Sequence, residues 1–161
     1  YFDDRRVRMK TDKIIPVWEH LSNIIGYRPA PQNKDCHDVL TNQFRYIDKS
    51  FNKSKDNYWH PHNDGGFNAI VYLNKNDDTC GTNLYKLIHP DLPITKGEHA
   101  EPWRSKKKWE RITTLKPAFN RCVIFDGGKF WHGMHIPDDR YSGEEYRLNQ
   151  IFFFQNEYSC T

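Results

Sequence analysis

Two candidate strands flank a glycine turn in the stretch Tyr58-Trp59-His60-Pro61-His62-Asn63-Asp64-Gly65-Gly66-Phe67-Asn68-Ala69-Ile70-Val71-Tyr72-Leu73. Aromatic and β-branched residues dominate Tyr58–His62 and Phe67–Leu73, and both compositions favour strands. The run from Asn63 to Gly66 between them is typical of a turn. The same alternation of short strands and turns continues along the chain, so this stretch predicts a mainly β protein.

Turn clusters rich in Gly, Asn, Asp and Pro separate the remaining candidate strands. These are expected at Gln43–Ile47, Asn83–Leu87, Arg111–Leu115, Cys122–Phe125, Phe130–His132 and Arg147–Phe154. Short strands at this spacing indicate an antiparallel sandwich or jelly roll rather than an α/β fold.

A single amphipathic helix is expected ahead of the strands. Its apolar residues recur at steps of three and four, which is the helical period. Pro16 suits the first turn and Gly26 suits the end of the helix. The predicted apolar stripe consists of Ile14, Val17, Trp18, Leu21, Ile24 and Ile25.

Length and composition limit the classes of protein that this chain can be. Its 161 residues suit one domain, residues 1–161, with 1–13 as a polar lead-in and 89–110 as a surface insert. No apolar run approaches the ~18 residues of a membrane span. The net charge of +3 is too small to indicate nucleic-acid binding by itself. The 4 cysteines form no C-x-x-C pair, which favours a reduced, cytoplasmic protein.

Three residues from two distant parts of the sequence suggest a metal site. His62 and Asp64 are two positions apart, so on an extended segment their side chains point to one face. His132 adds a second imidazole, and two histidines with one carboxylate occupy one face of a metal, as in non-haem Fe(II) oxygenases. The alternatives are a surface turn for His62 and Asp64, and a half-buried core histidine for His132.

Arg147 is expected to point into the protein, because it shares strand parity with Asn149, Ile151 and Phe153 in an apolar strand. A buried guanidinium needs an anionic partner, because an isolated desolvated charge is costly, and its planar fork matches a carboxylate. That partner is either an internal Asp or Glu, or the carboxylate of a substrate.

Taken in order, these residues resemble the iron(II)- and 2-oxoglutarate-dependent dioxygenases, and most closely their prolyl-4-hydroxylase-like branch. The resemblance runs from about Gln43 to Phe154. Several linking segments also resemble this branch: Phe44-Arg45-Tyr46, Val71-Tyr72-Leu73-Asn74, Gly81-Thr82-Asn83-Leu84 and the run from Lys116 to Phe125. The resemblance implies a double-stranded β-helix (jelly roll) with an N-terminal packing helix.

The resemblance also implies roles for individual residues. His62, Asp64 and His132 would bind iron, and Arg147 would bind the distal carboxylate of 2-oxoglutarate. Tyr72 would place its hydroxyl on the same carboxylate, and Tyr46 would line the cosubstrate pocket. Tyr72 can equally be a core tyrosine bonded to the backbone.

The activity implied is hydroxylation of a substrate by O2, with decarboxylation of 2-oxoglutarate to succinate and CO2. The cofactors implied are Fe(II), 2-oxoglutarate and O2. The prime substrate stays open between a peptide, a small molecule and a nucleic acid, and the oligomeric state is also open. Two alternatives remain: a cupin-like metal-binding jelly roll that does not use 2-oxoglutarate, and a non-catalytic module that binds carbohydrate or nucleic acid.

Other residues compete for these roles. His60 shares parity with His62 but has no carboxylate two residues later, and His135 follows His132 closely. Neither is the expected ligand. Basic residues between Arg104 and Arg111, with Trp103 and Trp109 among them, either recruit an acidic partner or form a solvated loop. The remaining histidines, treated as structural, are His20, His37, His89 and His99.

Overall fold

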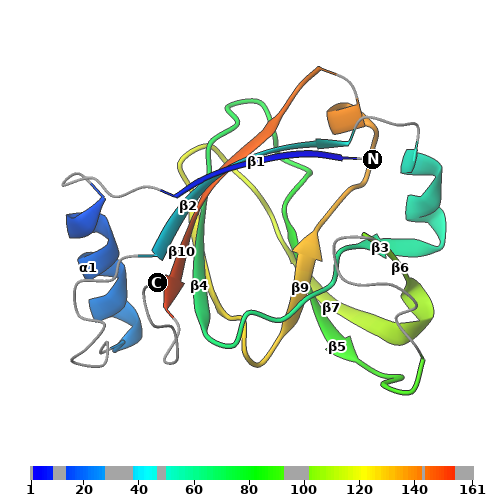
Figure 1. Ribbon diagram of the computed structural model, residues 1–161, viewed down its shortest axis with the longest axis horizontal. Coiled ribbons are helices and arrows are strands. Elements are labelled where there is room, and N and C mark those ends of the chain that lie inside the picture. Colours follow the sequence, from blue (N-terminus) through cyan, green and yellow to red (C-terminus); the bar gives the residue numbers. More distant parts are fainter. Residues whose placement is uncertain are drawn as a thin grey trace.

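The computed structural model describes residues 2–8, 14–27, 38–46, 50–92, 102–142 and 144–154. These residues are mainly β, with one α-helix, as the sequence predicts (Figure 1). The helix is α1 (Ile15–Ile25), and three short 3-10 helices are η2 (Ser50–Lys55), η3 (Lys106–Lys108) and η4 (Arg140–Ser142). The strands are β1 (Phe2–Arg8), β2 (Asp38–Tyr46), β3 (Asn57–Trp59), β4 (Phe67–Tyr72), β5 (Thr82–Leu87), β6 (Trp103–Ser105), β7 (Trp109–Leu115), β8 (Cys122–Asp126), β9 (Trp131–Met134) and β10 (Arg147–Phe154).

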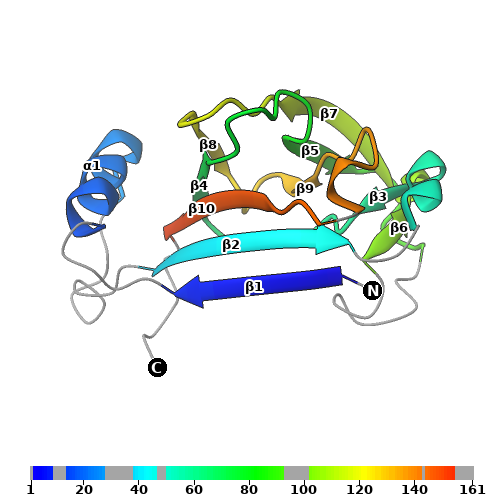
Figure 2. The same cartoon turned by 90° about the horizontal axis from the view of Figure 1, so that it is seen from above.

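The strands form three antiparallel sheets. The largest has the order β1-β2-β10-β4-β8, a second has the order β7-β5-β9, and β3 pairs with β6. In Figures 1 and 2 the five-stranded sheet lies on one side of the interior and the three-stranded sheet on the other. One buried cluster joins them, because Ile70 and Tyr72 of β4 pack with Leu84 of β5.

The other face of the large sheet is covered by α1. Ala69 of β4 and Phe152 of β10 pack against Trp18 and Leu21 of the helix. Alternate residues of β4 therefore face opposite sides, Ala69 toward α1 and Ile70 toward the interior, as the strand period requires. Figure 2 shows α1 beside one end of this sheet, opposite the end that carries β3 and β6.

The helix begins and ends as the sequence predicts, but its apolar stripe is narrower. Pro16 lies in the first turn, and Gly26 ends the helix with φ of 70°, in the left-handed region that glycine adopts without strain. Val17 and Ile24 were expected in the buried stripe, yet they are 43% and 60% exposed. A helix that packs on one sheet face buries only the residues directly beneath it, here Trp18 and Leu21. The described part of the chain contains no helix with the length and apolar character of a membrane span.

Two segments expected to be irregular contain strands. Residues 2–8, within the predicted polar lead-in, form β1 and pair with β2 from Phe2↔Tyr46 to Arg8↔Leu40. Backbone pairing at a sheet edge needs no apolar sequence, and charged residues are common on edge strands. The predicted surface insert 89–110 is partly buried: Trp103, which packs edge-on against Trp59, is 7% exposed, and Arg104 is 4% exposed. Residues 93–101 of that insert lie outside the described residues.

Strand boundaries differ most around the first candidate ligands. β3 ends at Trp59, so His62 is not part of the strand predicted over Tyr58–His62. It lies in the following loop and makes an isolated bridge with His132. β2 begins at Asp38, earlier than the expected Gln43. The strand Arg147–Phe154 has the predicted limits.

Candidate metal centre

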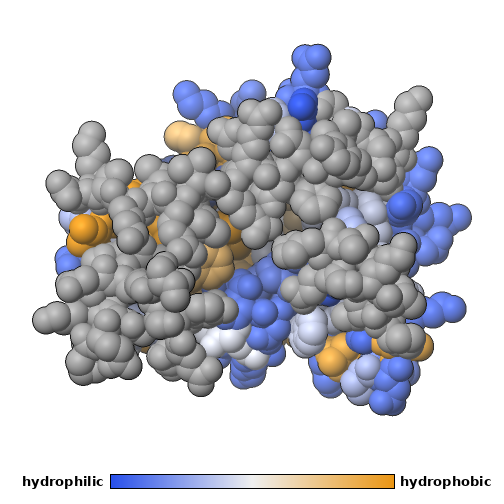
Figure 3. All heavy atoms as spheres, in the orientation of Figure 1, coloured by the Kyte–Doolittle hydropathy of each residue, from blue (hydrophilic) through white to orange (hydrophobic). Residues whose placement is uncertain are grey.

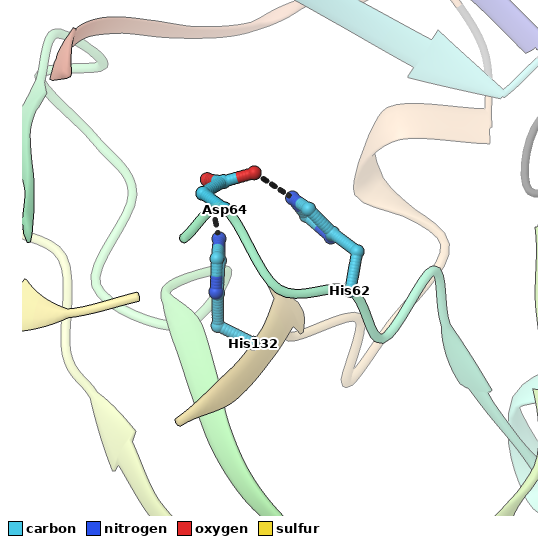
Figure 4. A group of neighbouring side chains, drawn as sticks. All are labelled: His62, Asp64 and His132. Carbon is cyan, nitrogen blue, oxygen red and sulfur yellow. Dashed lines mark hydrogen bonds and ion pairs between the residues drawn. The ribbon is translucent and has the colours of Figure 1, made fainter. Parts of the chain in front are cut away.

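His62, Asp64 and His132 lie together, although 68 residues separate Asp64 from His132. Figure 4 shows the carboxylate of Asp64 between the two imidazoles, with His132 on β9 and the other two residues on the loop after β3. His132 Nε2 lies 3.1 Å from Asp64 Oδ2, and His62 Nε2 lies 3.6 Å from Asp64 Oδ1. The potential ligand atoms of the group all lie within 4.8 Å of one another.

The backbone brings the two histidines together. The amide of His62 donates to the carbonyl of His132 at 2.9 Å, and the amide of His132 donates to the carbonyl of His62 at 2.8 Å. Gly133 makes this approach possible, because a Cβ at this position would lie 2.3 Å from the carbonyl oxygen of Trp59. A glycine after His132 therefore lets the loop lie directly on β9.

Asp64 is held by the glycine turn on which it lies. Gly65 has φ of 73°, and its amide donates to the side chain of Asn63. The Asn63 side chain in turn donates to the carbonyl of Gly128, and the Asp64 amide donates to the carbonyl of Gly127. The turn at Gly127 and Gly128, which follows β8, thus fixes the backbone of Asp64.

Both imidazoles use Nδ1 to bond the backbone, which leaves Nε2 to face Asp64. His62 Nδ1 lies 2.8 Å from the carbonyl oxygen of His60, and His132 Nδ1 lies 3.4 Å from that of Phe130. A carbonyl oxygen only accepts, so the proton of the neutral His62 ring is assigned to Nδ1. The lone pair of Nε2 is then directed at the shared centre, as in metal-binding histidines oriented by a backbone carbonyl.

The protonation states are also those that a metal requires. Burial, with the nearby imidazole of His132, lowers the pKa of His62 to about 4. Burial by itself would raise the pKa of Asp64, but its hydrogen bond to His132 and the neighbouring imidazole of His62 outweigh this and lower the pKa to about 2. At neutral pH His62 is therefore a neutral imidazole and Asp64 an ionised carboxylate, the forms that bind metal.

The donor set fits a divalent metal with open coordination positions. Ligand atoms at about 2.1 Å from a metal and at right angles are about 3.0 Å apart, close to the observed separations around Asp64. The side chain of His132 is 5% exposed, whereas those of His62 and Asp64 are 26% and 19% exposed. The group is thus anchored on the buried side and reachable from the other, an arrangement typical of catalytic rather than closed structural sites.

Sequence reasoning missed Asn68, which contacts this group directly. Its Nδ2 lies 2.5 Å from Asp64 Oδ2 and 3.3 Å from His132 Nε2. The signal was present, because Asn68 is a polar residue at an inward-facing position of β4, two residues before Ile70. A polar side chain at such a position needs a polar partner inside the protein.

Arg147 is buried, as predicted, and its nearest partners are backbone carbonyls. Its Nε donates to the carbonyl of Cys80 at 2.9 Å and its terminal nitrogen to that of Gly81 at 3.3 Å. The guanidinium also lies over the ring of Tyr72, 5.6 Å from the ring centroid. Within the described residues no carboxylate pairs with Arg147, so the internal Asp or Glu that the sequence allowed is not found there.

Of the two tyrosines expected near a cosubstrate, the structure describes the side chain of Tyr72 and not that of Tyr46. The hydroxyl of Tyr72 lies 2.9 Å from Thr82 Oγ1 and 3.3 Å from the carbonyl of Leu115. It is therefore bonded within the protein, and burial raises its pKa. Tyr46 ends β2, and its side chain lies outside the described part of the structure.

The competing histidines are not members of the group. The carbonyl of His60 orients the ring of His62, and Nδ1 of His135 lies 3.3 Å from the side-chain nitrogen of Asn83. His20 and His89 are exposed, and His37 and His99 lie outside the described residues. The expected basic cluster is only partly solvated, because Lys108 is buried and donates to the carbonyls of Pro90 and Leu92.

Similarity to known proteins is found among solved structures. No protein-family model and no curated protein matches the chain. Among solved structures, the chain is similar to the crystal structure of a Pseudomonas putida prolyl-4-hydroxylase, with a TM-score of 0.44 and 11% sequence identity over 96% of this chain and 69% of that chain. The functional proposals below therefore rest on the geometry of this chain's own residues.

Proposed function

We propose that this chain is an Fe(II)- and 2-oxoglutarate-dependent dioxygenase of the hydroxylase type. The observation that carries the proposal is the meeting of His62, Asp64 and His132, whose two Nε2 atoms and carboxylate oxygens face one point. Two imidazoles and one carboxylate are the donor set of non-haem Fe(II) oxygenases. A closed structural zinc site would use four protein ligands, usually with thiolates.

We propose further that the fold is a double-stranded β-helix. Its support is the way the chain alternates between the two larger sheets. From β4 in the five-stranded sheet it passes to β5 and β7 in the three-stranded sheet, and returns to the five-stranded sheet with β8. It then crosses to β9 in the three-stranded sheet and returns with β10 to the five-stranded sheet. Such alternation between two antiparallel sheets is characteristic of jelly rolls. In this fold His132 on β9 and the loop after β3 come together at one end of the interior.

The chain's own residues would orient the reaction at this centre. The backbone carbonyls of His60 and Phe130 fix the two imidazoles, and the Gly127 carbonyl fixes Asp64. Fe(II) bound there supplies the activation of O2 that couples oxidative decarboxylation of 2-oxoglutarate to hydroxylation of a C–H bond. Because three protein ligands leave positions open on the metal, the cosubstrate and O2 can both reach it.

Arg147 is the proposed partner of the distal carboxylate of 2-oxoglutarate. Its support is burial at 6% exposure with neutral carbonyl partners and no carboxylate partner among the described residues. A buried guanidinium bonded only to neutral groups retains a full positive charge, and an anion stabilises it strongly. Tyr72, which lies beneath the guanidinium, would shape the same pocket.

The test is anaerobic addition of Fe(II) and 2-oxoglutarate to the purified chain. We expect a visible metal-to-ligand charge-transfer band only when both are present, and succinate release when O2 is admitted with a suitable acceptor. The acceptor is then found by screening peptides, nucleic acids and small metabolites for a mass gain of one oxygen.

The same titration separates the alternatives. Fe(II) binding without the band would favour a metal-binding jelly roll that does not use 2-oxoglutarate. No Fe(II) binding would favour a non-catalytic module. The variant Asp64→Ala is the control, because it removes one ligand while leaving both histidines and Arg147 in place.

A further inference from the structure

Asn68 is a buried asparagine whose side chain reaches two of the three candidate ligands. It is 1% exposed and lies on β4, opposite Phe125 of β8 and Phe153 of β10. Its Nδ2 lies 2.5 Å from Asp64 Oδ2 and 3.3 Å from His132 Nε2. The amide is therefore wedged between the carboxylate and one imidazole.

The chemistry of the neighbours fixes which end of the amide faces them. An ionised carboxylate has no proton to donate, so the group pointing at Asp64 must be the NH2. The other end, Asn68 Oδ1, is buried and has no hydrogen-bond partner among the described residues. Asn68 therefore donates from its NH2 to Asp64, while its own carbonyl oxygen accepts no hydrogen bond from the described residues.

The glycine turn after β8 lies close to this amide. A Cβ on Gly127 would lie 2.9 Å from Asn68 Nδ2. The carbonyl of the same Gly127 accepts from the Asp64 amide at 3.3 Å. Asp64 is thus held at both ends: its backbone by the turn after β8, and its carboxylate by Asn68.

We propose that Asn68 is a positioning residue that anchors Asp64 Oδ2 and so fixes the rotation of the carboxylate. This inference rests on the proposed metal centre. An oxygen that accepts an N–H is a weaker donor to a metal, so Asn68 favours binding of the metal through one carboxylate oxygen rather than two. A one-oxygen ligand keeps open the positions that a cosubstrate and O2 need.

The experiment is a titration with Co(II) alone, followed by the visible d–d spectrum, on Asn68→Leu and Asn68→Thr. Leucine has the branched skeleton of asparagine without the donor, and threonine suits a strand but is too short to reach Asp64. We expect affinity for Co(II) to fall about 10- to 100-fold in both variants, as for other lost partners of metal ligands. We also expect the intensity of the spectrum to change, because an unanchored carboxylate alters the coordination number.

Asn83→Leu is the matched control, because Asn83 is equally buried and bonds Tyr85 and Thr114 instead of the candidate ligands. It should bind Co(II) with the affinity and spectrum of the unmodified chain. Thermal melting of each metal-free variant separates a structural role from a positioning role.

Two results would overturn the inference. Co(II) binding by the Asn68 variants with unchanged affinity and spectrum, even at a lower melting temperature, would make Asn68 merely structural while the proposed function stands. Failure of the unmodified chain to bind Co(II) would overturn the metal centre and this inference together. If Asn68→Leu does not fold, Asn68→Thr alone decides, since its β-branched side chain is compatible with β4.

Discussion

His62 and His132 exchange a pair of backbone hydrogen bonds, of 2.9 and 2.8 Å, although 70 residues separate them. The imidazole rings of the same two residues lie 4.2 Å apart between centroids. Backbone hydrogen bonds therefore hold the candidate centre together. They join the loop after β3 to β9 at His62 and His132, which are themselves candidate ligands. Whatever separates these two backbones should also separate the ligands.

Gly133→Ala is predicted to separate the loop after β3 from β9, and with it His62 from His132. The added Cβ would meet the backbone carbonyl of Trp59 at 2.3 Å, and backbone atoms cannot move aside as a flexible side chain can. We expect a loss of about 1–3 kcal/mol in the free energy of unfolding, measured in urea, together with weaker Co(II) binding. Gly128→Ala is the comparison, because its closest neighbour would be at 3.2 Å and is a side-chain oxygen. Equal effects of the two substitutions would contradict this explanation.

Arg147→Met is predicted to separate cosubstrate binding from metal binding. Methionine keeps much of the apolar stem but removes the charge and the bonds to Cys80 and Gly81. A hydrogen bond from a guanidinium to a carboxylate is worth about 1.5–3 kcal/mol, so losing the one proposed to 2-oxoglutarate should lower the affinity about 10- to 100-fold. Affinity for Fe(II) alone should not change.

The matched control for Arg147 is Arg121→Met, since Arg121 is exposed and its guanidinium donates to the carbonyl of Lys116. Affinities are read from the charge-transfer band at increasing 2-oxoglutarate. Unchanged affinity in Arg147→Met would remove Arg147 from the cosubstrate site and favour a metal-binding jelly roll of another kind.

Asp77 is predicted to make stability depend on acid pH. Burial would raise its pKa, but bonds from the Cys80 and Thr79 amides and from Tyr141 outweigh this and lower the pKa below its ordinary 3.8. The unfolded chain therefore binds this proton more readily than the folded one. The stability from Asp77 is complete above pH 3.8 and is lost as the pH falls through the lower, folded value.

Asp77→Asn should consequently cost about 2 kcal/mol at pH 7, as a charged hydrogen-bond acceptor is replaced. The difference from the unmodified chain should shrink as the pH falls below 3.8. Urea unfolding at several pH values measures this, and Asp78→Asn, at an exposed neighbour, should change little. A difference that is constant with pH would show that Asp77 contributes through shape rather than charge.

Much of the candidate site was predictable from the sequence because the ligands differ in kind from their surroundings. His62 and Asp64 lie beside a glycine turn, and Arg147 interrupts an apolar strand. The helix was also predictable from its period and its terminal glycine, whereas the exposure of Val17 and Ile24 was not. Periodicity identifies a face, but the area of contact with a neighbouring sheet decides how much of that face is buried.

The contacts made through the backbone were not predictable. β1 pairs with β2 along a highly charged segment, and the bridge between His62 and His132 depends on a distant close approach. Asn68 is polar within an apolar strand, yet only the fold shows that the position faces Asp64. Arg104, in the basic segment that the sequence left open between a solvated loop and a surface recruiting an acidic partner, is buried and donates to the carbonyl of Pro61.

The central claim is that His62, Asp64 and His132 hold one metal ion. The most direct test is anaerobic equilibrium dialysis against Fe(II), with bound iron measured for the unmodified chain and for His62→Ala, Asp64→Ala and His132→Ala. We predict about one Fe(II) per unmodified chain and a loss of at least about 100-fold in affinity in each variant, since every variant removes a direct ligand. No bound iron in the unmodified chain, or equal binding by any of the three variants, would contradict the claim.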